Sequence, residues 1–156
     1  MKKIKIILVD RTRKPFLKTG VLFYLDRLAK YIKTELIEVK SSKIGKGTPS
    51  RNIVSHEGEI LLKRLQPADY VISLDRSGKR VNSERFAKNI GRILERTDNL
   101  VFLVGGPLGL SSKVLNISNE IISLSNLTFT HEMSRLILLE QIYRAFTILR
   151  GEKYHK

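Results

Sequence analysis

Val101–Leu110 has the sequence VFLVGGPLGL, in which an unbroken apolar run leads into a pair of glycines. An apolar run without polar alternation is typical of a strand that is covered on both faces, as in a parallel sheet. Gly105, Gly106 and Gly109 lack a Cβ, so the backbone there can turn sharply or lie directly against a ligand. This stretch predicts a buried strand that ends in a tight loop, and it leaves open whether the loop binds a ligand or only turns the chain.

The composition limits the class of protein. A chain of 156 residues is long enough to bury a core of its own without crosslinks. It contains no cysteine, which excludes a disulfide framework, a thiolate nucleophile and a cysteine-ligated zinc site. No apolar run approaches the length of a membrane span, and the apolar stretch 6–9 is too short for a signal peptide. We therefore expect a soluble, cytoplasmic protein with a single domain over residues 1–156.

The charge balance indicates a polyanionic partner. There are 29 lysines and arginines against 15 aspartates and glutamates, a formal net charge of +14. Such an excess attracts nucleic acid, a ribosome or an anionic membrane, and nucleic acid is the interpretation that we favour over a merely basic surface. No segment has the pattern of a known RNA-binding module, so the core domain itself would have to bind the RNA.

Strand and helix patterns alternate along the chain. Short apolar runs predict strands at 3–9, 35–39, 69–74, 101–104 and 120–124. Apolar residues at helical spacing predict helices at 16–32, 51–65, 82–95, 112–117 and 133–150, with Asn82 or Ser83 and Ser111 or Ser112 as N-caps. Polar or basic loops are expected at 40–50, 75–80 and 125–131. This order predicts an α/β architecture with a mainly parallel sheet.

Three of the predicted loops are candidates for a ligand site. In parallel sheets, ligands bind beyond the carboxyl ends of the strands, which here points to the loops after Leu74, Val104 and Leu124. The glycine loop matches neither the phosphate-binding loop of nucleotide triphosphatases nor the dinucleotide fingerprint. The lysines of the 40–50 loop would also suit phosphate contact. His56 has no second histidine at ligand spacing, so we interpret it as an ordinary helix residue.

Four segments, in this order, resemble a known family: LDRSGK (74–79), FLVGGPLGL (102–110), LSNLTFTHEMSRLILLEQIYRA (124–145) and RGEKYHK (150–156). Together they resemble the RlmH-type SPOUT methyltransferases. The resemblance implies a SPOUT-type parallel sheet with flanking helices and a C-terminal trefoil knot, and a homodimer. It also implies that S-adenosylmethionine is used to methylate N3 of a pseudouridine in 23S ribosomal RNA within the assembled ribosome, with no metal and no membrane involved.

The resemblance also implies which residues form the site. The cofactor would be held by Leu74, Gly105, Gly106, Ser125, Asn126, Leu127, Thr128, Phe129 and Thr130. The catalytic residues would be His131, Arg135, Tyr154 and His155. Either histidine could accept the N3 proton, while Arg135 and Lys156 would contact the RNA. A side chain at Gly106 is expected to abolish cofactor binding and to leave the fold largely intact.

Two positions depart from the family pattern. Thr130 stands where the family often has a proline, and VDRTRK (9–14) replaces its usual glycine-lysine turn after the first strand. Two other functions remain open from the residues alone. One is a basic RNA- or ribosome-binding α/β protein without enzymatic activity, and the other is a SPOUT methyltransferase that acts on another RNA such as tRNA.

Overall fold

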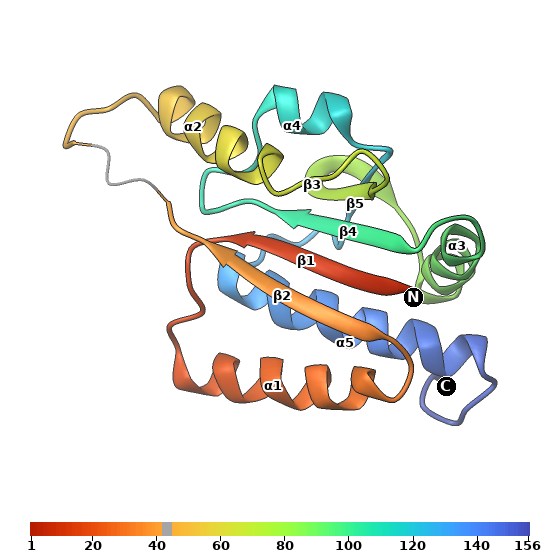
Figure 1. Ribbon diagram of the computed structural model, residues 1–156. Coiled ribbons are helices and arrows are strands. Elements are labelled where there is room, and N and C mark those ends of the chain that lie inside the picture. Colours follow the sequence, from red (N-terminus) through yellow and green to blue (C-terminus); the bar gives the residue numbers. More distant parts are fainter. Residues whose placement is uncertain (42–44) are drawn as a thin grey trace.

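A computed structural model describes residues 1–41 and 45–156 and contains a five-stranded parallel sheet of order β2-β1-β4-β3-β5 (Figure 1). The strands are β1 (Lys3–Val9), β2 (Lys33–Val39), β3 (Tyr70–Arg80), β4 (Asn99–Val104) and β5 (Glu120–Ser123). The helices are α1 (Pro15–Ala29), α2 (Ser50–Leu62), α3 (Ser83–Arg96), α4 (Ser112–Ile117) and α5 (His131–Leu149). The predicted alternation of strands and helices and the parallel sheet are confirmed.

The sheet lies between two layers of helices. Figure 1 shows α2 and α4 on one side of it and α1 and α5 on the other, with α3 beside α5. Successive side chains of a strand point to opposite faces, so β4 supplies both cores. Phe102 packs in the core under α1, α3 and α5, whereas Val101 and Leu103 pack in the core under α2 and α4. All three side chains are fully buried, as the apolar run predicted.

The end of β3 differs from the prediction. Residues 75–80 were expected to form a polar loop, but β3 continues through them to Arg80. Its pairing with β5 shifts register between Leu74 and Lys79, so both of these residues lie opposite Ile122. A Cβ at Gly78 would lie 2.6 Å from the carbonyl carbon of Ile122, so glycine permits this close pairing of the two strands. The prediction was wrong because backbone pairing at a sheet edge does not require apolar side chains.

Both departures from the family pattern have a simple structural basis. Asp10 has φ of +71° and accepts a hydrogen bond from the backbone N–H of Arg11 at 2.9 Å. Aspartate tolerates this left-handed conformation better than most residues, so it can replace a glycine at this turn. Thr130 has φ of −60° and ψ of 151°, a conformation that proline also adopts. Its hydroxyl accepts a hydrogen bond from the N–H of Met133 at 3.2 Å and thereby caps α5.

Other boundaries shift by a few residues. α1 ends at Ala29 and α5 begins at His131, whereas Asn82 and Ser111 cap α3 and α4 as expected. Lys43, one of the lysines proposed for phosphate contact, lies outside the described residues, and that hypothesis remains a prediction. Within the described part of the chain, no helix is long and apolar enough to cross a membrane.

Candidate functional site

A cavity of about 350 Å³ lies at the carboxyl ends of β3, β4 and β5. The three loops that the sequence singled out line it, together with the first turn of α5. From the predicted cofactor residues, the lining contains Leu74, Gly105, Gly106, Ser125, Leu127, Thr128 and Phe129. The other two predicted cofactor residues, Asn126 and Thr130, are not in the lining. Asn126 accepts a hydrogen bond from Arg80, and Thr130 caps α5.

A second, larger groove lies elsewhere. It has a volume of about 820 Å³ and is lined by the start of β2 and by the carboxyl-terminal ends of α1 and α5. Ile32, Phe146 and Leu149 give it an apolar surface, and the predicted site residues lie outside its lining. The candidate site is therefore the smaller cavity, because it alone collects the loops at the strand ends that the fold makes available to a ligand.

The glycine loop forms one wall of the cavity. Gly106 and Gly109 form an antiparallel bridge, in which the N–H of Gly109 donates to the carbonyl of Gly106 at 3.0 Å. Gly109 has φ of +82°, which favours glycine, and a Cβ at Gly105 would lie 2.6 Å from the Gly109 carbonyl oxygen. A side chain at Gly105 would therefore collide with the backbone, whereas one at Gly109 would be strained by the positive φ. The loop is therefore both a tight turn and a backbone surface that faces a cavity.

Gly106 faces a different neighbour than expected. A Cβ built there would lie 3.3 Å from Glu57 Oε2 on α2 and 3.3 Å from a methyl group of Val9. Neither residue is in the cavity lining. A side chain at Gly106 would thus press on the buried carboxylate behind the wall and displace the loop. Loss of cofactor binding remains the prediction for such a variant, but the cause would be displacement of the wall and not filling of the cavity.

His131 is the titratable ring in the cavity lining. It is the first residue of α5 and is partly buried. Burial, reinforced by the neighbouring Arg135 guanidinium, lowers the pKa of His131 below its ordinary value of 6.5. The imidazole is therefore neutral at physiological pH, and a neutral ring nitrogen can accept a proton from a bound substrate.

A titration of His131 is expected to have its midpoint below 6.5. The folded protein then binds this proton less tightly than the unfolded chain does, so the histidine's contribution to stability is complete above 6.5 and is lost as the pH falls through its lowered pKa. Proton NMR of the ring signals gives the midpoint, and His131→Asn assigns the signal. A midpoint at or above 6.5 would contradict this description of the site.

Arg135 lies inside the protein and outside the cavity lining. Its side chain is 1% exposed. One terminal nitrogen donates to Thr12 Oγ1 at 3.0 Å and the other to the carbonyl of Val9 at 2.6 Å. Nearby, Glu132 accepts a hydrogen bond from the N–H of Arg13. The start of α5 is thus fastened to the loop after β1. In this structure Arg135 presents no exposed guanidinium to an RNA phosphate, and its predicted role in catalysis and RNA contact stays a prediction.

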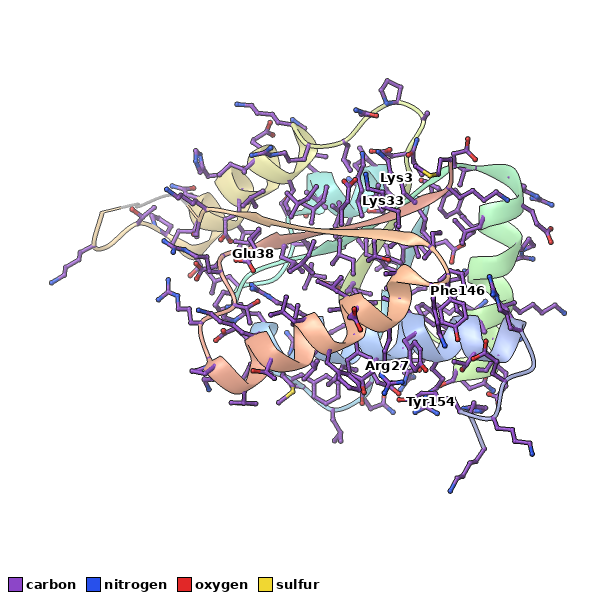
Figure 2. All side chains as sticks on the ribbon, turned by 60° about the horizontal axis from the view of Figure 1, so that its bottom comes forward. Lys3, Arg27, Lys33, Glu38, Phe146 and Tyr154 are labelled. Carbon is purple, nitrogen blue, oxygen red and sulfur yellow. The ribbon has the colours of Figure 1, made fainter. Side chains whose placement is uncertain are left out.

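The C-terminal tail packs far from the cavity of its own chain. Tyr154 Oη donates to Glu140 Oε1 at 3.0 Å, and burial raises the pKa of Tyr154 above its ordinary value. His155 lies between Arg144, at 3.1 Å from Nδ1, and Glu84 of α3, at 2.8 Å from Nε2. Figure 2 shows Tyr154 on the side of the molecule that carries Arg27.

The distance along α5 separates the tail from His131. Glu140, which holds Tyr154, lies nine residues beyond His131 on that helix, or about 14 Å. The structure therefore brings His131 to the cavity but leaves Tyr154, His155 and the exposed Lys156 away from it. Sequence reasoning missed the partners of the tail. Two of them, Glu140 and Arg144, lie one helical turn apart and form an ion pair with an N–O distance of 2.6 Å.

The chemistry of the lining suits a nucleoside-type cofactor. Leu74, Leu127 and Phe129 offer apolar surface, and the glycine loop offers backbone N–H and C=O groups without intervening side chains. The shape of the glycine loop depends on the absence of a Cβ at Gly105, since a methyl group there would collide with the backbone of Gly109. Among the described residues, no group of three or more histidines, aspartates and glutamates could hold a metal ion. Fold and site together define an α/β protein with a cavity at the strand ends that is suited to a small organic ligand.

Comparison with known proteins makes this class specific. The model of a family described as "Predicted SPOUT methyltransferase" matches residues 1–155, and the chain belongs to this family. It is 44% identical over 158 aligned positions to the ribosomal RNA large subunit methyltransferase H of Halothermothrix orenii, with 99% of each chain covered. It is 40% identical to the protein of the same name from Carboxydothermus hydrogenoformans, again with 99% of each covered.

Solved structures share the fold. A probable methylase family protein from Haemophilus influenzae Rd KW20 superposes with a TM-score of 0.58 at 14% identity, covering 98% of this chain and 70% of that one. A tRNA (m1G37) methyltransferase from Aquifex aeolicus superposes with a TM-score of 0.54 at 12% identity, covering 92% and 70%. The predicted family and the α/β fold class are thereby confirmed, and the chain is a methyltransferase of the SPOUT family.

Proposed function

We propose that this protein uses S-adenosylmethionine to methylate N3 of a pseudouridine in the 23S RNA of the large ribosomal subunit. It would act on the assembled ribosome, as a cytoplasmic homodimer with one knotted domain over residues 1–156. The observation that carries the proposal is the cavity at the strand ends, lined by the glycine-containing loop 104–110 in a chain of this family. The names and full-length coverage of the relatives support the ribosomal substrate.

Different residues of the cavity would bind the cofactor and accept the proton. S-adenosylmethionine, when bound, supplies an activated methyl group, so the protein must mainly align the reactants and receive a proton. Backbone groups of Gly105, Gly106 and Ser125 would hold the polar parts of the cofactor, while Leu127 and Phe129 would cover its apolar parts and exclude water. The neutral imidazole of His131 would be available for the N3 proton.

The position of the tail supports the proposed homodimer. Tyr154 and His155 are held against the middle of α5 and against Glu84 of α3, away from the cavity of their own chain. If these residues act on the substrate, as the family resemblance implies, a second copy has to bring its tail to the cavity. His155 would then be the second candidate for the proton, and the exposed Lys156 would contact a phosphate of the RNA.

A row of cations on α3 would extend the RNA-binding surface from the tail. Arg85, Lys88, Arg92 and Arg96 are exposed and recur at intervals of three or four residues, so they share one face of the helix. The row begins next to Glu84, the residue that contacts His155. A line of exposed cations follows a phosphate backbone without reading its sequence.

Replacing Arg85, Lys88 and Arg92 by glutamine is expected to weaken binding to large ribosomal subunits. It should also reduce the magnitude of the slope of log affinity against log salt concentration by about 2 to 3. Each phosphate contact that is lost means that about one counterion fewer is released on binding. Cofactor binding should not change. Arg51, Lys63 and Arg64, exposed at the two ends of α2, provide a control with the same loss of charge. Equal salt slopes for the two triple variants would show that α3 has no special part in binding.

Methyl transfer to different forms of RNA tests the substrate. Labelled S-adenosylmethionine is supplied with naked large-subunit RNA, isolated subunits, assembled ribosomes or tRNA. We expect label in the large-subunit RNA of ribosomes. Transfer to naked tRNA alone would contradict the proposed substrate and retain the enzyme class. Calorimetry that detects no binding of S-adenosylmethionine at millimolar concentration would contradict the cofactor itself.

A further inference from the structure

Glu57 carries a buried carboxyl group that lies next to the candidate site. The proposed mechanism does not use this residue. It lies on α2 and is 4% exposed. Among the described residues, its Oε1 atom has no hydrogen-bond partner. Burial of a carboxylate without full compensation is costly, and such groups in native proteins usually have a partner in the functional state.

The carboxyl group of Glu57 lies directly behind the glycine wall. A Cβ at Gly106 would be 3.3 Å from Oε2 and 3.6 Å from Oε1, and Gly106 itself lines the cavity. Only a residue without a side chain therefore separates this carboxylate from a ligand. Glycine at this position keeps the ligand close enough to the buried charge for an electrostatic interaction through a medium of low polarity.

The surroundings of Glu57 leave its charge poorly compensated. Burial, as the largest effect, raises the pKa of Glu57, and the negative charge of Asp10 at the end of β1 raises it further. The Ser41 side chain and the neighbouring His56 lower the pKa of Glu57 and so act in the opposite direction. A positive charge in the cavity would favour the ionised carboxylate.

We propose that Glu57 determines cofactor specificity by favouring S-adenosylmethionine, whose sulfonium carries a positive charge, over its product S-adenosylhomocysteine, whose sulfur is neutral. This inference rests on the proposed function. During transfer the methyl–sulfur bond breaks and its electron pair stays on sulfur, while the N3 electron pair forms the new bond and the N3 proton passes to a base. The positive charge on sulfur disappears in this step. Glu57 then loses its partner, and the product is held less tightly than the substrate.

Asp75 is another carboxylate near the cavity, and its situation differs from that of Glu57. It lies in the cavity lining, but its Oδ2 accepts hydrogen bonds from the N–H of Ser77 at 2.9 Å and from the hydroxyl of Ser77 at 2.5 Å. These donors already compensate its charge. A positively charged ligand would therefore stabilise the carboxylate of Glu57 more than that of Asp75, although Asp75 is closer to solvent.

The stability of a Glu57 variant distinguishes a site role from a structural one. Because folding raises the pKa of this group, its favourable contribution is complete only at acidic pH and is lost as the pH rises through the folded pKa. Glu57→Gln keeps the shape and removes the charge. This variant should therefore unfold at the same or a higher temperature than the parent protein at neutral pH, whereas loss of a purely structural carboxylate would lower that temperature.

The test compares two ligands by calorimetry at about pH 8, because a carboxyl group with a raised pKa is ionised to a greater extent at alkaline pH. In Glu57→Gln we expect the affinity for S-adenosylmethionine to fall about ten-fold, and the affinity for S-adenosylhomocysteine to stay the same. Glu57→Asp, which retains the charge, should keep the preference. Glu59→Gln is the matched control, because Glu59 lies two residues further on α2 and pairs at the surface with Lys113 at 2.7 Å.

An unchanged ratio of the two affinities in Glu57→Gln would overturn the inference, whether both affinities stay the same or fall equally. A change of the ratio in Asp75→Asn alone would assign the preference to Asp75 instead. If Glu57→Gln does not fold, loss of the preference in the folded Glu57→Asp would also overturn it. Failure of the parent protein to bind S-adenosylmethionine would instead refute the proposed function, so the two failures are distinguishable.

Discussion

Gly105→Ala is expected to weaken binding of S-adenosylmethionine by about a hundred-fold or more while the sheet stays folded. The new methyl group would lie 2.6 Å from the carbonyl oxygen of Gly109 and 2.7 Å from its carbonyl carbon. Both are backbone atoms and cannot rotate away, so the loop would have to open and its cavity-facing groups would lose their positions. β4 ends before this residue, so the buried core is preserved. Calorimetry measures the affinity, and thermal unfolding checks the fold.

Gly45→Ala provides the control for this variant. A Cβ at Gly45 would have open space within 4 Å among the described residues, so the same chemical change should leave cofactor binding unaltered. A Gly105→Ala protein that binds S-adenosylmethionine as well as the parent would show that the glycine loop does not hold the cofactor.

Removing Tyr154, His155 and Lys156 is expected to slow methyl transfer by about a hundred-fold or more and to leave cofactor binding unchanged. The tail carries a candidate proton acceptor, but it contacts Glu140, Arg144 and Glu84 rather than the cavity lining. Single-turnover methylation of ribosomes and calorimetry with S-adenosylmethionine measure the two effects separately. A truncated protein with the parent's rate would show that the tail takes no part in the reaction.

Mixing two inactive proteins tests where the tail acts. The Gly105→Ala chain has a tail but no intact cofactor loop, and the truncated chain has the reverse. In a mixed dimer the tail of the first chain can meet the cavity of the second, so we expect activity to reappear when the two are refolded together. An inactive mixture with demonstrated mixed dimers would contradict transfer of the tail between copies.

The central part of the fold could be predicted because its signals are local. The apolar run before Gly105 identifies a doubly covered strand, and strand order along the chain places three loops at one edge of a parallel sheet. The continuation of β3 to Arg80 gave no such signal. Its residues are polar, and only the backbone of β5, more than forty residues further on, reveals that they form a strand.

The features around the site that sequence reasoning missed depend on contacts between distant residues. Glu57 resembles any polar residue of an amphipathic helix until α2 packs against the loop at Gly106. His155 meets Glu84 across 71 positions of sequence. Arg135 has the spacing of a partner for His131, but the carbonyl of Val9 holds it inside the protein. Local patterns therefore predicted where the cavity lies, whereas the charges behind and beside it required the folded chain.

Mass spectrometry of large-subunit ribosomal RNA tests the proposed function most directly. The RNA is compared between cells that contain this protein, cells that lack its gene, and cells complemented with the Gly105→Ala variant. We predict one N3-methylated pseudouridine that is present in the first cells and absent from the other two. The same set of methylated pseudouridines in all three would contradict the assignment of this methyltransferase to the large ribosomal subunit.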